Sequence, residues 1–243
     1  MKNKNVKNKI LIVGGSSGLG LHITNMYLKK NYRVSIICRT KNKKFPKKLD
    51  QYICDVTKEA KLQRTLKIIK EKHNYFDTII HNVGGSQKVF DEHSTSKDYL
   101  KVWRANFGYI IDINNFFIPS MKKNKWGRII HVSSSAAYNF TAPVPYSSAK
   151  AALNTYVSSI SRRLIKDRIV ASCICPGPIE LPRRFMSIAK RKNNSFWKNY
   201  TKNHLPIKRL AKPEEITSVI YFLSSELASF SSGAIWNVDG SEY

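Results

Sequence analysis

The chain has 243 residues, of which 42% are apolar, and this is enough for one large α/β domain with a buried core. No apolar run approaches the roughly 20 residues that span a bilayer, and the run 10–13 is too short for a signal-peptide core. We therefore expect a cytoplasmic protein without a membrane span. The 42 Lys and Arg against 16 Asp and Glu give a net charge of +26, which either attracts polyanions or reflects a lysine-rich composition.

Four cysteines lie at or near the ends of apolar, strand-like runs and form no Cys-x-x-Cys pair: Cys38, Cys54, Cys173 and Cys175. We expect buried thiols, as in proteins of a reducing compartment. The six histidines show no ligand spacing, so the sequence predicts no metal site.

The first predicted strand, 9–13, runs straight into a glycine-rich turn, and a helix follows to about Lys30. A glycine-rich turn between a strand and a helix lets the backbone approach a pyrophosphate, whose charge the helix N-terminus favours. We therefore predict a phosphate-binding turn formed by Gly14, Ser16, Ser17, Gly18 and Leu19.

The second predicted strand, 33–38, ends in Arg39 and Thr40 without an acidic residue. In a nucleotide-binding fold an acid at this position would hold a ribose 2′-hydroxyl, whereas an arginine suits a 2′-phosphate. Arg39 therefore favours NADP(H) over NAD(H). The loop 41–48 that follows is basic and has no apolar periodicity.

Further alternation of strands and helices follows. We predict strands at 51–56 and 77–81, a helix at 59–73, and a long helix from Ser96 to Phe117 that ends before Pro119. Asn106 lies in the middle of that long helix, where a buried amide must find partners. The pattern predicts a doubly wound parallel sheet in a single domain, residues 1–243.

The fifth predicted strand begins at Gly127 and ends in hydroxyls, shortly before Tyr146 and Lys150. Tyr146 and Lys150 are four residues apart, so on a helix they share one face. A tyrosine has a pKa near about 10, which a neighbouring ammonium lowers. Tyr146 could then exchange a proton with an alcohol or alkoxide oxygen, and a serine hydroxyl could hold the same oxygen.

Two serines compete for that last role. Ser133 and Ser134 point to opposite sides of an extended strand, so only one of them can serve. The position of the strand end favours Ser134, which we choose as the catalytic hydroxyl.

The sixth predicted strand, 168–173, leads to Pro176, Gly177 and Ile179. The segment 180–208 has little core pattern and many cations: Arg183, Arg184, Lys190, Arg191, Lys192, Lys198 and Lys202. It is either a solvated face or a binding surface for an anionic substrate or carrier. Lys212-Pro213 begins a helix, and 234–240 forms the last strand and turn.

Taken together, these motifs resemble the short-chain dehydrogenase/reductase family from about Lys9 to Gly240, and in particular its 3-oxoacyl-[acyl-carrier-protein] reductase-like members. The matching features are the Ser…Tyr-x-x-x-Lys spacing, the Gly-x-x-x-Gly-x-Gly turn and the closing Val-Asp-Gly. Val13 replaces the usual threonine, and His81 and Val83 depart from the family's Asn-Asn-Ala-Gly. Tyr146 follows Ser134 by twelve positions, one fewer than the commonest family spacing; counting back thirteen gives Ser133.

The resemblance implies roles for further residues. Asp55 and Val56 would border the adenine, Asn82 and Gly84 the ribose, and Pro176 and Gly177 the nicotinamide. Lys150 would also hold the ribose, and Asn106 would hold a water that links Lys150 to solvent. Independently of the resemblance, we interpret His81 as a hydrogen-bonded core residue rather than a catalytic one. The segment 180–208 would be a substrate lid, and the helices that start at Ser96 and Pro145 would form a homodimer or homotetramer.

We therefore predict an NADP(H)-dependent oxidoreductase that interconverts a ketone and a secondary alcohol. The sequence leaves three substrate classes open: a carrier-linked 3-oxoacyl group, a nucleotide-linked sugar and a small neutral ketone. One alternative is a non-catalytic NADP-binding regulatory protein. The other is a basic nucleic-acid-binding protein. Two observations argue against it: the cations are spread over the chain, and no known nucleic-acid motif occurs.

Overall fold

In the computed structural model, which describes residues 9–140, 142–182 and 185–242, seven parallel strands form one sheet in the order β3-β2-β1-β4-β5-β6-β7. The strands are β1 (Lys9–Val13), β2 (Arg33–Cys38), β3 (Asp50–Ile53), β4 (Thr78–His81), β5 (Gly127–Val132), β6 (Ile169–Pro176) and β7 (Ile235–Val238). The order reverses beside β1, which pairs with both β2 and β4. The predicted doubly wound parallel sheet is confirmed.

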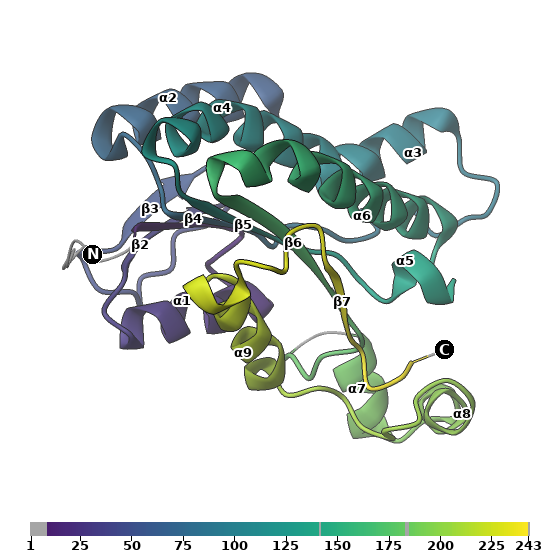
Figure 1. Cartoon of the computed structure of the whole chain (residues 1–243). Coiled ribbons are helices and arrows are strands. Elements are labelled where there is room, and N and C mark those ends of the chain that lie inside the picture. The colour runs from purple at the N-terminus through teal and green to yellow at the C-terminus, as the bar shows by residue number, and fades with distance from the viewer. Residues whose placement is uncertain (1–8, 141, 183–184, 243) are drawn as a thin grey trace.

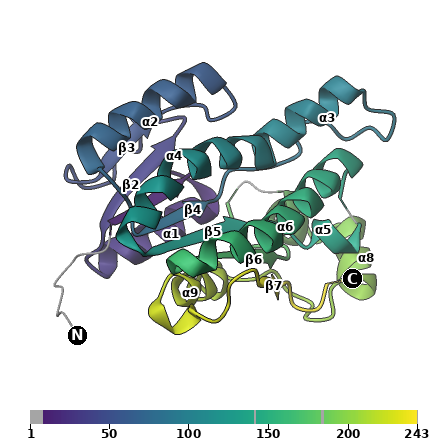
Figure 2. The same cartoon turned by 45° about the horizontal axis from the view of Figure 1, so that its top comes forward.

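Helices cover both faces of the sheet. α2, α4 and α6 lie over one face, and α1 and α9 lie over the other (Figure 1); Figure 2 shows the first group from above. The helical segments of the described residues are α1 (Gly18–Lys29), α2 (Glu59–His73), α3 (Ser96–Trp103), η1 (Arg104–Gly108), α4 (Tyr109–Asn124), α5 (Ala136–Asn139), α6 (Val144–Leu164), η2 (Ile165–Asp167), α7 (Phe185–Lys192), α8 (Ser195–Asn203), α9 (Pro213–Leu223) and η3 (Glu226–Ala228).

Local apolar spacing explains where these elements form. Ile10 to Val13 is buried on both faces, as a central parallel strand must be. In α2 the residues Leu62, Leu66 and Ile69 are fully buried at spacings of four and three. The predicted bounds of β1, β2 and α2 are confirmed to the residue.

The helix that carries Asn106 is longer than predicted. α3, the π-helical turn η1 and α4 follow one another without a break, so the predicted end before Pro119 is wrong. A proline removes the hydrogen bond to the carbonyl four residues earlier, here that of Asn115. Both residues are exposed, so water can solvate this carbonyl, while Ile118 and Met121 continue the buried face of the helix.

The segment 180–208 also has more structure than its sequence predicted. α7 and α8 pack around a small cluster of their own, formed by Ala189, Trp197, Tyr200, Leu205 and Leu210. The expectation of little core pattern is therefore wrong, because five apolar side chains spread over 22 positions are enough to fold two short helices against each other. We call residues 180–208 the lid; that this segment covers a substrate stays a prediction.

No helix of the described residues is long and apolar enough to cross a membrane. All four cysteines are free and buried, as their positions in apolar runs predicted.

Candidate active site

A cleft of about 870 Å³ opens at the carboxyl ends of the strands, where the strand order reverses. Such a crevice is where open α/β sheets bind ligands. Most residues predicted to hold a cofactor line it: Gly14, Ser16, Ser17, Leu19, Arg39, Asp55, Val56, Asn82, Gly84, Tyr146, Lys150, Gly177 and Ile179. Four other predicted residues are not among those that line it: Gly18, Asn106, Ser134 and Pro176.

The glycine turn is packed too tightly for side chains. A Cβ on Gly14, whose φ is +87°, would lie 2.8 Å from a Val83 methyl, and a Cβ on Gly20 would lie 1.9 Å from the Gly14 carbonyl oxygen. Ser17 is the N-cap residue of α1, yet its side chain makes no capping hydrogen bond, and the first turn has no acid. The N-terminal N–H groups of α1 therefore suit an anion such as a pyrophosphate.

Cations surround the end of the cleft next to β2. Arg39, Lys41, Lys43 and Lys44 all line it. Hydrogen bonds from Thr57 and the charge of Arg39 hold the pKa of Asp55 below its usual value, although its partial burial acts to raise that pKa. This end is therefore built for an anionic group.

Three of the five lysines in the loop 41–48 line the cleft, and the sequence analysis did not identify them as site residues. The absence of apolar periodicity marked this loop as a plain connection, but Asn42 Nδ2 donates to the Ser16 carbonyl oxygen at 3.2 Å and so ties the loop to the glycine turn. The signal that could have found them is a basic run directly after a strand that ends in Arg39.

Asn106 holds the loop that follows β4. Its Oδ1 accepts from Gly85 N at 2.9 Å, and its Nδ2 donates to the carbonyl oxygens of Gly85 and Val102, both at 2.8 Å. It lies in the π-helical turn η1, a distortion that is frequent at functional sites. A Cβ on Gly84 would lie 2.6 Å from Asn106 Oδ1 and 3.2 Å from Lys150 Nζ, so the glycine brings this loop against both side chains.

Tyr146 and Lys150 lie together at the start of α6, as their spacing predicted. Lys150 Nζ is 5.7 Å from the centre of the Tyr146 ring and donates to the Val132 carbonyl oxygen at 2.8 Å. Burial lowers the pKa of Lys150 to about 8, partly offset by the nearby thiols of Cys173 and Cys175. A cation that is buried beside a phenol favours its ionised form and so assists proton exchange.

The two candidate serines have different surroundings. Ser133 is buried, and its hydroxyl donates to the Lys150 carbonyl oxygen at 3.4 Å. Ser134 is half-buried, and its Oγ accepts from Ala136 N at 3.2 Å, at the start of α5. Ser133 lines the cleft, but its hydroxyl faces the helix backbone.

The far wall of the cleft comes from the sheet end and the lid. Gly177 N donates to the Val238 carbonyl oxygen at 3.2 Å, which fixes the turn after β6. Leu181, Phe185 and Met186 add apolar side chains to the wall, a contribution that the sequence did not indicate. Arg183 and Arg184, two of the predicted lid cations, lie outside the described residues.

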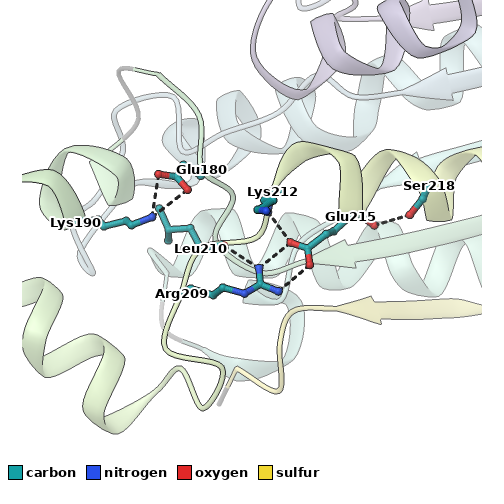
Figure 3. Close-up of polar contacts among 7 residues, drawn as sticks. All are labelled: Glu180, Lys190, Arg209, Leu210, Lys212, Glu215 and Ser218. Atoms are coloured by element: carbon teal, nitrogen blue, oxygen red, sulfur yellow. Dashed lines mark hydrogen bonds and ion pairs between the residues drawn. The ribbon is translucent and has the colours of Figure 1, made fainter. Parts of the chain in front are cut away.

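Ion pairs hold the base of the lid (Figure 3). Lys190 Nζ lies 2.9 Å from Glu180 Oε1, and Arg209 donates to both carboxylate oxygens of Glu215 at 2.8 Å. Ile179 and Ala211 form a parallel bridge between the two ends of the lid. The lid is therefore anchored on both sides where it leaves the main domain.

A polar cluster lies deep beneath this site. His81 is fully buried, its Nε2 hydrogen-bonds Asn114 Oδ1 at 2.9 Å, and its ring stacks on that of His131 at 5.1 Å. The interpretation of His81 as a hydrogen-bonded core residue is confirmed. Burial lowers the pKa of His131 to about 4, so this histidine is neutral at physiological pH.

The arrangement fits a nicotinamide dinucleotide by its own chemistry. The glycine turn and the N-terminus of α1 suit a pyrophosphate, and the cations beyond β2 suit a ribose phosphate. Tyr146 and Lys150 provide proton exchange elsewhere in the same cleft. In the described part of the chain, no three His, Cys, Asp or Glu side chains converge as metal ligands would.

Comparisons with known proteins agree with this reading of the cleft. The 3-oxoacyl-[acyl-carrier-protein] reductase MabA of Mycobacterium tuberculosis is 29% identical over 236 residues, which cover 97% of this chain and 92% of that protein. L-Sorbose reductase from Gluconobacter frateurii, solved with NADPH and L-sorbose, superimposes with a TM-score of 0.86 at 25% identity, covering 97% of this chain and 96% of that one. A short-chain dehydrogenase from Leptospira borgpetersenii, solved with bound NAD+, shares the fold with a TM-score of 0.83 at 21% identity, covering 99% and 96% of the two chains.

A family model described as short chain dehydrogenase matches residues 8–193. This match spans the glycine turn, the Asn82–Gly85 loop, Asn106 and the Tyr146–Lys150 pair. The chain therefore belongs to the short-chain dehydrogenase family and is an oxidoreductase that acts on CH–OH groups.

Proposed function

We propose that the protein is an NADP(H)-dependent reductase that interconverts a ketone and a secondary alcohol. The observation that carries the proposal is the pairing of Tyr146 with the buried ammonium of Lys150 in the same cleft as the phosphate-binding turn. When bound, the reduced nicotinamide supplies a hydride for the carbonyl carbon. Tyr146 gives its proton to the carbonyl oxygen, and Ser134 donates a hydrogen bond to the same oxygen as charge develops on it.

Lys150 has two tasks in this scheme. In it, the Lys150 charge favours the ionised form of the Tyr146 phenol, and the Lys150 ammonium binds a ribose hydroxyl. The side-chain amide of Asn106 already forms hydrogen bonds with the backbone of Gly85 and Val102. We therefore propose that the backbone of the π-helical turn η1, rather than this side chain, holds the water of the proton relay. Such a turn leaves a carbonyl without its usual helical partner.

The preference for NADP(H) rests on the cations beside β2. Arg39, Lys43 and Lys44 line the cleft there, and no acid stands at the end of β2 to hold a ribose 2′-hydroxyl. The relatives include proteins named for NADPH and for NAD+ complexes, so a competition between the two cofactors is the direct test.

For the substrate we propose a 3-oxoacyl group on an anionic carrier. The lid exposes Arg191, Lys192 and Lys198, and the same segment supplies apolar side chains to the cleft wall. MabA is named for this substrate class. Replacing Arg191 and Lys192 by Gln should raise KM for acetoacetyl-coenzyme A and leave KM for neutral ethyl acetoacetate unchanged. Equal effects on both would refute an anionic substrate. The same comparison can be made for Arg183 and Arg184.

We also propose that the protein works in the cytoplasm as a homodimer or homotetramer. Four free, buried thiols fit a reducing compartment, and α3 exposes Leu100 and Trp103. Light scattering during size-exclusion chromatography should give a mass above 27.9 kDa, and Leu100→Glu should lower it. A monomeric wild-type protein would overturn the proposal.

The test of the function is NADPH oxidation with three carbonyl compounds: acetoacetyl-coenzyme A, L-sorbose and ethyl acetoacetate. Tyr146→Phe should lower turnover by roughly 10²–10⁴-fold while NADPH still binds. Tyr52→Phe is the matched control, because its hydroxyl hydrogen-bonds His73 and neither residue lines the cleft. Binding of NADPH without reduction of any of the three would favour a regulatory protein instead.

A further inference from the structure

The residues that follow β7 lie between two parts of the site. In Figure 1 the segment that follows β7 runs between the lid helix α8 and α5, which begins two residues after Ser134. Two tyrosines bind this segment through their hydroxyls. Tyr138 of α5 donates to Asp239 Oδ2, and Tyr200 of α8 donates to Glu242 Oε1.

Both carboxylates are unusual in a chain of this charge. With 42 basic residues against 16 acidic ones, most acids would be expected opposite a cation. Glu242 is instead 7% exposed, its Oε1 accepts from a tyrosine, and its Oε2 has no hydrogen-bond partner among the described residues. Burying a carboxylate costs free energy, so its position here requires a compensating structural contact.

Residues 239–242 also pack closely against the turn that follows β6 and against the end of the lid. A Cβ on Gly177 would lie 2.7 Å from the Asp239 carbonyl oxygen, and a Cβ on Gly240, whose φ is +67°, would lie 2.5 Å from an Ile207 methyl. Residues 239–242 therefore contact the cleft wall, α5 and the lid at once.

We propose that Asp239 and Glu242 are positioning residues for the reduction: they tie α5 and the lid helix α8 to the turn at Gly177, and so hold a substrate over Tyr146. This inference rests on the proposed function. The lid needs such a tie because its two halves are held differently. The Ile179–Ala211 bridge and ion pairs fix its base, whereas Tyr200 lies in the other half, on α8. Its bond to Glu242 joins that half to the residues that follow β7.

The tyrosines keep their donor role over a wide pH range. Burial raises the pKa of Tyr138 above its ordinary value, and the hydrogen bond to Asp239 raises it further. Burial and Glu242 do the same for Tyr200. Both phenols therefore remain protonated donors throughout the range in which the reductase would work.

The kinetic test compares Tyr200→Phe, Glu242→Ala and Glu242→Gln with NADPH and acetoacetyl-coenzyme A. Tyr200→Phe and Glu242→Ala should raise KM for the ketone about tenfold, the size of one lost charge-assisted hydrogen bond, with NADPH affinity within about twofold of wild type. Glu242→Gln keeps an acceptor for Tyr200 and should recover most of the loss. The double variant Tyr200→Phe/Glu242→Ala should be no worse than either single one.

A second readout needs no substrate. The lid exposes Arg191, Lys192 and Lys198, so trypsin should cut it faster in Tyr200→Phe and Glu242→Ala than in wild type, Glu242→Gln or the control Tyr52→Phe. Wild-type cleavage rates and KM in all variants would overturn the proposal, as would a lower melting temperature without a change in KM. If the wild type reduces no ketone, the proposed function fails, whereas the cleavage rates still decide whether this segment tethers the lid.

Discussion

Asn106 and Gly85 hold each other through two hydrogen bonds, one from the Gly85 N–H to Asn106 Oδ1 and one from Asn106 Nδ2 to the Gly85 carbonyl oxygen. The pair joins the π-helical turn to the loop that lines the cofactor cleft. It therefore connects a distortion in the helix to the position of the loop that contacts Lys150.

Replacing Asn106 should disturb both stability and cofactor binding. Asn106→Ala leaves three backbone groups without their side-chain hydrogen bonds: the N–H and C=O of half-buried Gly85 and the C=O of buried Val102. A buried polar group left unsatisfied costs about 1–3 kcal/mol. Urea unfolding should show a loss of at least about 2 kcal/mol, and NADPH should bind more weakly. Asn115→Ala on the exposed side of α4 is the control. Unchanged NADPH affinity in Asn106→Ala would show that the loop holds its position alone.

Single alanine variants decide between the two serines. Ser134→Ala should lower kcat by about 10²–10³, as expected when one donor to a developing oxyanion is lost. Ser133→Ala should mainly lower the melting temperature, because its hydroxyl binds the Lys150 backbone within the core. Steady-state kinetics and thermal unfolding of both variants separate these effects. The reverse pattern would transfer the catalytic role to Ser133.

Lys150 should make stability rise with pH. Its pKa is about 8 in the folded protein and about 10.4 in an unfolded chain. Between these values the unfolded state binds more protons, so the free energy of unfolding increases with pH, and below about pH 8 the penalty for burying the charge is complete. The total gain is up to about 3 kcal/mol.

This gain is measured by urea unfolding at pH 7.5 and pH 10.5, with Lys150→Met as the reference for all other titrating groups. The difference in unfolding free energy between the two proteins should change in favour of the wild type at the higher pH. If this difference in unfolding free energy were the same at both pH values, Lys150 would remain well solvated in the folded protein.

Arg39 should control the choice of cofactor. Arg39→Ala removes a cation from the cleft and should weaken NADPH binding by roughly 10–100-fold, the range of a charge-assisted hydrogen bond of about 1.5–3 kcal/mol, with little effect on NADH. Arg33→Ala, at the exposed start of β2, is the matched control for net charge. Cofactor fluorescence titrations measure both. Equal losses for the two cofactors would remove the 2′-phosphate interpretation.

Gly20→Ala should destabilise the protein although alanine is the better helix former. In an exposed helix the change gains up to about 1 kcal/mol, but here a Cβ would lie 1.9 Å from the Gly14 carbonyl oxygen. The melting temperature and NADPH affinity should both fall. His22→Ala, two residues further along the same helix, should leave NADPH affinity unchanged. A stabilised Gly20→Ala would show that the turn can move away from α1.

The fold and much of the site follow from short-range patterns. Buried strands such as 9–13 and 33–38 and the face shared by Tyr146 and Lys150 depend on spacings of a few residues, which the sequence displays directly. The glycine turn and Arg39 are likewise fixed by their place at strand ends, because parallel strands bring those ends to one edge.

Only the tertiary structure shows the features that depend on contacts between residues far apart in the chain. Ser133 faces Lys150 because α6 packs on that side of β5, which no local pattern reveals. The helix passes through Pro119 because burial of its apolar face outweighs one lost hydrogen bond. Asp239 and Glu242 meet tyrosines 101 and 42 positions away, since only folding brings α5, the lid and the residues after β7 together.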